Sequence, residues 1–431
     1  MSDDDVFGRR SREDLIAEVR RRAARRRLRR RGVLTAAAAV VAAVSISVPL
    51  SLAGGARRTT IKVIAPSTLS SVPPTSIPPG KPTGVPLNAS ILDLSWADSA
   101  TGWALSQQPC PQGLCASLER TTDGGGHWAV LPNPPAVVGA TGQDCTKLTC
   151  VSGVLFATSN VGYLYGPALL LTTDGGRAWT VQTGLQVEMM AVAGGQVFRL
   201  VYQHGGCPGP CNPVLQSAPA GSSSWQTVPL AIDGVGWGSS QMLTSGPVIY
   251  LALYGNLAHR LEAAMIYRSL DSGRTWVTLD DPCFAHSHLY VLTQLSVAPG
   301  GFVAGLCQQA SSPPKASVVV STDGGNRWNT PGPIPGISYP GLIATASPNR
   351  IAVASAPTLG IGSSTAQLVV SQDRGTHWTT VASEKQQISG TEPAWLGFQS
   401  AETGRWVSGP NTIWTTINGG LLWTESTVPV P

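Results

Sequence analysis

Short apolar runs that end in a polar turn recur along residues 88–431. The segments SVVVSTD, AQLVVSQD, ALLLTTD and AAMIYRSLD are examples, and each leads into a glycine-containing turn and a tryptophan. Runs of this length, rich in β-branched residues and bounded by turn residues, are typical of strands. A further apolar run follows the tryptophan, so each unit predicts a β-hairpin.

The turn is itself a repeated string of the form S/T-x-D-x-G-x-x-W, with Asn418 in the Asp position of the last copy. The six copies are TTDGGGHW (121–128), TTDGGRAW (172–179), SLDSGRTW (269–276), STDGGNRW (321–328), SQDRGTHW (371–378) and TINGGLLW (416–423). A degenerate copy in SAPAGSSSWQTV keeps Trp225, lacks the Asp and has its Gly displaced by one. Successive tryptophans are 51, 46, 51, 52, 50 and 45 residues apart, which indicates a repeat architecture.

A second alternating pair of segments precedes most copies, as in ILDLSWADSATGWALSQ. Two hairpins in about 50 residues make a four-stranded antiparallel sheet, so we predict an all-β, seven-bladed β-propeller over residues 88–431. In each turn the Asp accepts backbone N–H groups, Gly supplies positive φ and Trp packs on a neighbouring strand. We therefore predict a structural role for Asp123, Trp128, Asp174, Trp179, Asp271, Trp276, Asp323, Trp328, Asp373, Trp378, Asn418 and Trp423.

This string resembles the Asp-box, or BNR repeat, of sialidase-like β-propellers, and the resemblance covers residues 88–431. It implies that the turns lie on the outer rim while ligands bind near the central axis. The family contains sialidases, xyloglucan-cleaving glycosidases, sortilin-type receptors and a photosystem assembly factor. Fold alone therefore does not determine the function.

Sialidase chemistry needs three Arg that converge on the substrate carboxylate, a Tyr nucleophile activated by a Glu, and an Asp acid. The nearest match to the Arg-Ile-Pro start of the family is FRLV (198–201), which lacks the Pro and falls in the third repeat. Outside the turns, the inner hairpins hold Arg199, Arg350 and Arg405. We do not expect a sialidase.

A glycosidase with two axial carboxylates is the rival hypothesis. The candidate acids near inner strands or loops are Asp93, Asp98, Asp144, Asp233, Asp280, Asp281, Glu392 and Glu402, and their spacing selects no pair. The sequence contains no metal-binding set of His and Cys and no phosphate-binding loop, so we expect no metal and no cofactor.

The N-terminal region predicts a membrane anchor. Residues 1–31 carry 12 Arg and 6 acids, and the uncharged residues 32–56 are long enough for the ~20 residues of a membrane span. The positive-inside rule then puts the N-terminus in the cytoplasm and the propeller outside the cell. The alternative is a signal peptide cleaved near Ala53–Ala56. Residues 57–87 are rich in Pro, Ser and Thr and predict a stalk.

Charge and cysteine usage agree with this topology. Beyond residue 31 the chain holds 17 basic and 18 acidic residues, so we expect no nucleic-acid partner. All eight Cys follow the apolar segment, as in proteins of oxidising compartments. One of roughly a hundred possible connectivities pairs Cys110 with Cys115, Cys145 with Cys150, Cys207 with Cys211 and Cys283 with Cys307. Zinc ligation is the alternative use of these thiols.

These observations favour binding over catalysis. We expect a monomeric bacterial envelope protein whose propeller binds a glycan or another envelope protein. An assembly factor for an envelope complex is a further alternative. Three tryptophans outside the repeated turns, Trp103, Trp237 and Trp406, are the candidate ligand contacts, and packing in the core is the alternative role for each.

Overall fold

The structure is a computed structural model that describes residues 90–429 apart from 111–112, 139–149, 183–185, 204–211, 233–236, 256–263, 287–289, 299, 310–314, 338–339, 356–362 and 388–394. The chain divides into two units, Met1–Pro79 and Gly80–Pro431, and every described residue belongs to the second. The predicted arm, anchor and stalk lie outside the described residues. Among the described residues, no helix has the length and apolar character needed to cross a membrane.

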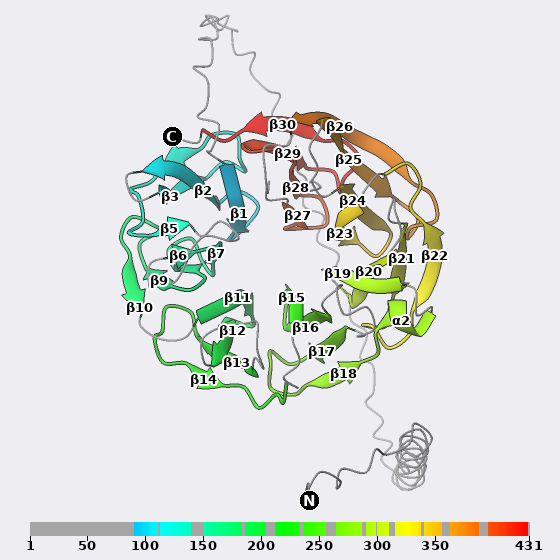
Figure 1. Cartoon of the computed structure of the whole chain (residues 1–431), viewed down its shortest axis with the longest axis horizontal. Helices are drawn as coiled ribbons and strands as arrows, with labels where there is room; N and C mark the ends of the chain where they lie inside the picture. The colour runs from blue at the N-terminus through cyan, green and yellow to red at the C-terminus, as the bar shows by residue number, and fades with distance from the viewer. Residues whose placement is uncertain are drawn as a thin grey trace, which may run out of the picture. The chain divides into compact units, whose positions relative to one another are not determined.

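Seven mainly antiparallel sheets form a ring in the second unit (Figure 1). We call them blades 1 to 7 in chain order. In each blade the first strand lies beside the central axis and the fourth lies on the outer rim (Figure 1). The prediction of an all-β, seven-bladed propeller is confirmed.

The strands occupy the same four stations in every blade. The first strands are β1 (Ser90–Trp96), β7 (Gly153–Phe156), β11 (Gln186–Ala193), β15 (Trp237–Ser245), β19 (Tyr290–Ala298), β23 (Pro340–Ser347) and β27 (Trp395–Phe398). The second strands are β2 (Gly102–Cys110), β8 (Gly162–Tyr165), β12 (Gln196–Gln203), β16 (Val248–Gly255), β20 (Phe302–Gln309), β24 (Arg350–Ser355) and β28 (Gly404–Val407).

The outer half of each blade contains the third and fourth strands. The third strands are β3 (Gly113–Thr121), β9 (Leu169–Thr172), β13 (Asn212–Pro219), β17 (Met265–Ser269), β21 (Ala316–Ser321), β25 (Ser363–Ser371) and β29 (Thr412–Thr416). The fourth strands are β4 (Ala129–Val130), β10 (Thr180–Gln182), β14 (Gln226–Thr227), β18 (Val277–Leu279), β22 (Asn329–Pro333), β26 (Thr379–Gln387) and β30 (Thr424–Thr427). A short helix, α2 (Pro282–His286), follows β18.

Blade 1 departs from the predicted four strands because its sheet has six. The fourth strand β4 pairs with β3 only at Glu119 and Arg120. The short strand β5 (Val137–Val138) pairs with β3 at Cys115, and β6 (Cys150–Val151) adds in parallel to β5. The additional strands extend the hydrogen bonding of a β3 edge that β4 is too short to cover.

The hydrophobic core consists of clusters that lie between neighbouring blades. Between blades 1 and 2, for example, Trp103 and Leu118 pack with Phe156 and Leu170. An equivalent cluster joins blade 7 to blade 1, where Val407 and the residues around it meet the first two strands of the chain. Each blade draws its strands from one continuous stretch of chain, so side-chain packing closes the ring without any exchange of strands.

Candidate functional site

Each complete repeated turn, here called a turn box, lies between the third and fourth strands of its blade. In the first box, Thr121 Oγ1 donates to Asp123 Oδ1 and accepts the Gly125 N–H, both at 2.9 Å. Asp123 Oδ1 also accepts the His127 N–H at 2.9 Å. The other five boxes repeat these three bonds, with Asn418 in the Asp role in blade 7.

The box backbone turns through two successive left-handed residues. Gly124 and Gly125 have φ of 77° and 98°, and Ser272 and Arg374 adopt the same conformation at the first of these positions. These two are the positive-φ residues other than Gly among the described residues. The side-chain bonds of the boxes therefore hold a turn that Ser and Arg would otherwise adopt at a cost.

Hydrogen bonds keep the box carboxylates ionised. The N–H and imidazole of His127 lower the pKa of Asp123, and the hydroxyl and N–H of Thr275 lower the pKa of Asp271 to about 2. Their donors come from the box itself, within four residues of the Asp. These carboxylates serve local turn geometry, which matches the structural role predicted for them.

Four boxes also accept a hydrogen bond from the preceding blade around the ring. The bonds run from Trp103 Nε1 to Gly175 O (3.1 Å), from Arg268 Nη1 to Gly324 O (2.5 Å), from Arg350 Nη1 to Asn418 O (3.1 Å) and from Arg405 Nη2 to Gly124 O (2.8 Å). The box carbonyls thus help to set the spacing of neighbouring blades. Arg350 and Arg405 act here as links between blades and lie on second strands, not on the axis.

The tryptophans predicted to contact a ligand occupy other places. Trp103 is 0% exposed and stacks on Phe156 with 3.6 Å between ring centroids, while Trp406 is 1% exposed between blades 6 and 7. Both are core residues, so core packing is confirmed for them and their role as ligand contacts is wrong. Alternation along a strand locates a tryptophan on one face but does not show whether a neighbouring blade covers that face. The side chain of Trp237 lies outside the described part of the structure.

The cysteines form disulfides where the structure describes them. Cys110–Cys115 has a Cα–Cα distance of 5.7 Å, and Cys283–Cys307 ties α2 to β20 with a Cα–Cα distance of 5.5 Å. Cys150 is also disulfide-bonded. Cys145, Cys207 and Cys211 lie outside the described residues. Within the described ranges, no group of three or more His, Cys, Asp or Glu could hold a metal ion.

Beside the axis, the first strands of blades 1, 3, 4, 5 and 6 share an irregularity. Each carries a β-bulge in its pairing with the second strand. In β11 the register skips from Val187 to Met189, so Glu188 is the extra residue. Bulges re-aim side chains and are common next to functional sites.

A cavity of about 350 Å³ lies against these strands, and we call it the axial pocket. Four blades contribute to its wall, namely blades 7, 1, 2 and 3. The residues that matter chemically are Asp93, Tyr165, Met190, Trp395 and Phe398. The wall therefore combines a carboxyl group with aromatic and thioether surface.

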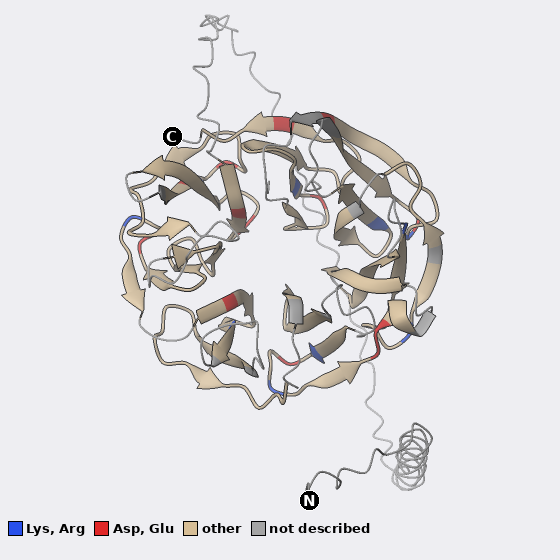
Figure 2. Ribbon diagram, in the orientation of Figure 1, with Lys and Arg blue, Asp and Glu red and all other residues tan. Residues whose placement is uncertain are grey.

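The charge beside the axis is acidic. The seven first strands contain two charged residues, Asp93 and Glu188, and neither Lys nor Arg. Figure 2 shows the two acidic positions on β1 and β11, whereas the Lys and Arg of the described residues lie on other strands and on turns. Three Arg cannot converge on a ligand from these strands.

Asp93 both links blades and faces the pocket. Its Oδ1 accepts the Leu94 N–H and its Oδ2 accepts the Val154 N–H of blade 2, both at 2.9 Å. A neutral amide makes the equivalent link between blades 4 and 5, where Gln241 Oε1 accepts the Leu295 N–H at 2.9 Å. A carboxyl group is therefore not required for the link itself.

The surroundings of the two axial acids favour their protonated forms. Burial raises the pKa of Asp93 to about 7 against the two backbone hydrogen bonds, and burial also raises the pKa of Glu188. Burial, followed by the charges of Asp93 and Glu188, raises the pKa of Tyr165 well above its usual value. Tyr165 therefore lies within electrostatic reach of both acids.

Of the other candidate acids, Asp98 and Glu402 lie in turns. Asp98 accepts the N–H groups of Ala100 and Thr101, which lower its pKa. Glu402 lies in the equivalent turn of blade 7, where its N–H donates to Ser400 Oγ at 3.2 Å. Asp144, Asp233 and Glu392 lie outside the described residues.

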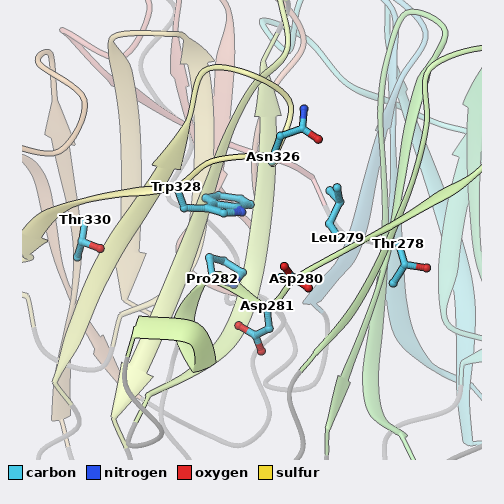
Figure 3. Close-up of a pocket in the computed structure, with 9 residues that line it drawn as sticks. Thr278, Leu279, Asp280, Asp281, Pro282, Asn326, Trp328 and Thr330 are labelled. Carbon is cyan, nitrogen blue, oxygen red and sulfur yellow. The ribbon is translucent and has the colours of Figure 1, made fainter. Parts of the chain in front are cut away.

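A second cavity, of about 410 Å³, lies on the rim between blades 4 and 5. Figure 3 shows the Trp328 ring there among Asn326, Pro282 and Asp280. Asp281 in its wall accepts the N–H groups of Ala264, Cys283 and Phe284 and so caps α2. The most deeply buried carboxylate in the wall of this cavity is therefore committed to structure.

Comparison with solved structures returns seven-bladed β-propellers. YCF48 bound to a D1 peptide aligns at 19% identity and a TM-score of 0.49, over 78% of this chain and 95% of that chain. An ancestral GH74 enzyme aligns at 12% identity and a TM-score of 0.50, over 78% of this chain and 46% of that chain. The Hadza microbial sialidase Hz136 aligns at 13% identity and a TM-score of 0.41, over 64% of this chain and 68% of that chain. Sequence identities this low support a shared fold and nothing more specific.

No protein-family model matches the chain, and no curated protein matches it significantly. The function must therefore be argued from the site. The sequence identified Asp93 as a candidate acid, but it did not identify Glu188 or Tyr165. The signal that was available is that Glu188 is the one charged residue in the otherwise uncharged strand QVEMMAVA.

Proposed function

We propose that this chain is a binding module that recognises its ligand at the axial pocket of a rigid β-propeller. The observation that carries the proposal is the contrast between acids. The rim Asp residues accept their hydrogen bonds within their own turns, whereas Asp93 lines a cavity with aromatic walls and Glu188 lies on β11, two residues from Met190 of the same wall. Cavities of ~300–1,000 Å³ with apolar walls and a few polar groups are typical ligand sites.

We also propose that the propeller lies outside the cell, held by an N-terminal membrane anchor. Supporting it are the uncharged residues 32–56 behind an Arg-rich arm and the disulfides of the propeller. The ligand would then be a glycan or protein outside the cell. Protease treatment of intact cells should digest an epitope tag at the C-terminus and spare one at the N-terminus. Non-reducing peptide mapping should also find Cys145 linked to Cys150 and Cys207 linked to Cys211; free thiols throughout would contradict this topology.

The binding function is tested with the purified full chain in detergent. Glycan-array and peptide-array binding should give ligands that saturate one site per chain. Their affinity should fall with Trp395→Ala and stay unchanged with Trp328→Ala, since Trp328 lines the rim cavity. Unchanged affinity of the Trp395→Ala variant would show that the ligand does not bind in the axial pocket.

A glycosidase remains the second candidate because two carboxyl groups of raised pKa flank the axis. In the structure, however, both oxygens of Asp93 accept backbone N–H groups. Hydrolysis of oligosaccharides by the full chain, abolished by Asp93→Asn, would favour the enzyme. Binding without release of sugar would favour the module.

A further inference from the structure

We infer that the axial pocket binds an arginine side chain presented by a protein segment. This deepens the binding function proposed above and rests on it, because it names the ligand class of the same site. The argument starts from charge. Asp93 and Glu188 are the charged residues of the seven first strands, so their ionised forms would repel an anionic group and attract a cation.

The aromatic wall narrows the choice of cation. Trp395, Phe398 and Tyr165 line the pocket together with Asp93. A guanidinium group can pair with a carboxylate in its plane and stack on an aromatic face at the same time, whereas a small ion cannot stack. Among the described residues, moreover, no set of three metal-ligand side chains was found.

The protein already uses this chemistry both between and within its own blades. The Arg405 guanidinium lies over the Trp96 ring with its Cζ 3.3 Å from the centroid, and the Arg199 guanidinium lies over Trp225 at 4.0 Å. Trp96 borders the axial pocket, next to Asp93 in β1. Guanidinium stacking on tryptophan is therefore a contact that this fold accommodates at the edge of the same cavity.

A guanidinium group is carried by arginine, so this inference favours a protein ligand over a neutral glycan. The pocket volume of about 350 Å³ suits one side chain with its flanking backbone, not a folded domain. The ligand is therefore an exposed segment or terminus that projects an arginine toward the axis.

Isothermal titration of the full chain in detergent tests this at pH 8 and low salt. The probe is acetyl-Gly-Ser-Arg-Ser-Gly-amide, and the matched probe carries citrulline, which is neutral and nearly isosteric, in place of Arg. We expect one site per chain and affinity on the order of tenfold weaker or more for the citrulline peptide. Equal affinity for the two peptides, or no binding of the arginine peptide, would overturn the inference.

Variants locate the site. Asp93→Asn keeps an acceptor for the Val154 N–H, and Glu188→Gln keeps the size of the side chain; both are measured singly and together, with thermal melts as the test of folding. The double variant should weaken the arginine peptide at least about tenfold. Glu425→Gln removes the same charge from the exposed outer strand β30 and should leave affinity within about twofold.

The outcomes separate the ligand class from the binding function. If cellotetraose binds, the arginine peptide does not, and the double variant weakens cellotetraose, the axial pocket binds ligand and the arginine assignment is wrong. If the arginine peptide binds equally to wild type and double variant, the assignment to this pocket is wrong. Weakening by Glu188→Gln alone supports the inference even where Asp93→Asn fails to fold.

Discussion

Carboxyl groups on the rim and beside the axis of this propeller experience opposite environments. The rim residue Asp174 accepts the N–H groups of Arg177 and Ala178 and the hydroxyl of Thr172, and its pKa is lowered. Asp93, beside the axis, is surrounded by protein, and burial raises its pKa to about 7. The difference shows that the abundance of Asp in the repeated turns says little about chemistry, because those groups are stabilised as anions where they stand.

A buried acid interacts more strongly with a nearby cation than an exposed acid does, because less solvent screens their attraction. A cation that enters the pocket would stabilise the charged forms of Asp93 and Glu188, and this gain would contribute to affinity. A rim carboxylate has no such gain to offer, since its own turn already stabilises the anion. Four predictions test this difference between axial and rim carboxyl groups, in order of decreasing expected effect.

The stability of the wild-type chain should fall as pH rises from 5 to 8, with Asp93 contributing up to about 3 kcal/mol. The folded chain retains the Asp93 proton up to a pKa of about 7, while the unfolded chain releases it near 4, so the contribution is lost as pH rises through 7. Glu119, buried beside Ser106 and Ser117 with a pKa of about 7, adds to the same slope. Urea unfolding at several pH values measures it.

Asp93→Asn should reduce that slope, and Asp174→Asn should not, because hydrogen bonds from its own turn lower the pKa of Asp174 in the folded chain. An equal change of slope for the two variants would show that axial and rim acids do not differ as described.

Asp93→Ala should cost about 2 kcal/mol of unfolding free energy, because it leaves the Val154 N–H between blades without its acceptor. Asp93→Asn should cost much less at pH 7, since Gln241 shows that an amide oxygen makes an equivalent link. Urea unfolding at pH 7 compares the two. Similar losses would mean that the carboxyl group itself is required for the link.

On the rim, Asp174→Ala should lower Tm by roughly 2–4 °C, because the turn loses its central acceptor. Asp174→Asn should lower Tm by less than half as much. Asn418 already fills this role in blade 7, where it accepts the Leu422 N–H at 2.9 Å. Calorimetry measures Tm for the two variants. An equal loss of Tm would show that the charge of Asp174, and not its role as an acceptor, matters at the rim.

The smallest effect is expected for His377→Ala. His377 Nδ1 lies 2.5 Å from Asp373 Oδ2, but both side chains are exposed, and exposed ion pairs contribute little. The His377 N–H, which the substitution keeps, also bonds to Asp373. Tm at pH 6 should change by less than about 1 °C; a fall as large as that of Asp174→Ala would show that the imidazole is part of the box.

The sequence predicted the fold well because the evidence for it is local. A β-branched run, a turn with glycines and a tryptophan define one hairpin without reference to the rest of the chain, and the even spacing of Trp128, Trp179 and the later tryptophans defines the repeat. The disulfides at Cys110 and Cys283 were predictable for the same reason. Cys110 and Cys115 are five residues apart, and Cys283 on α2 pairs with Cys307 on β20, 24 residues further along the chain.

The site was less predictable because it depends on register and on neighbouring blades. The bulge in β11 makes Glu188 an unpaired extra residue, and no count of alternating positions reveals a bulge. Trp103 and Trp406 looked available because only the adjoining blade buries them. The charges of Asp93 in blade 1 and Glu188 in blade 3 both act on Tyr165 in blade 2, and this proximity exists only once the blades have assembled into the ring.

The proposed site requires that Asp93 and Glu188 ionise in response to a bound cation. Carboxyl-carbon NMR titration of the full chain, with and without the arginine peptide, tests it most directly. We predict a free pKa of about 7 for Asp93, and a marked fall of the Asp93 and Glu188 pKa values when the peptide binds. A free pKa near 4 for Asp93, or pKa values unchanged by saturating peptide, would contradict the account.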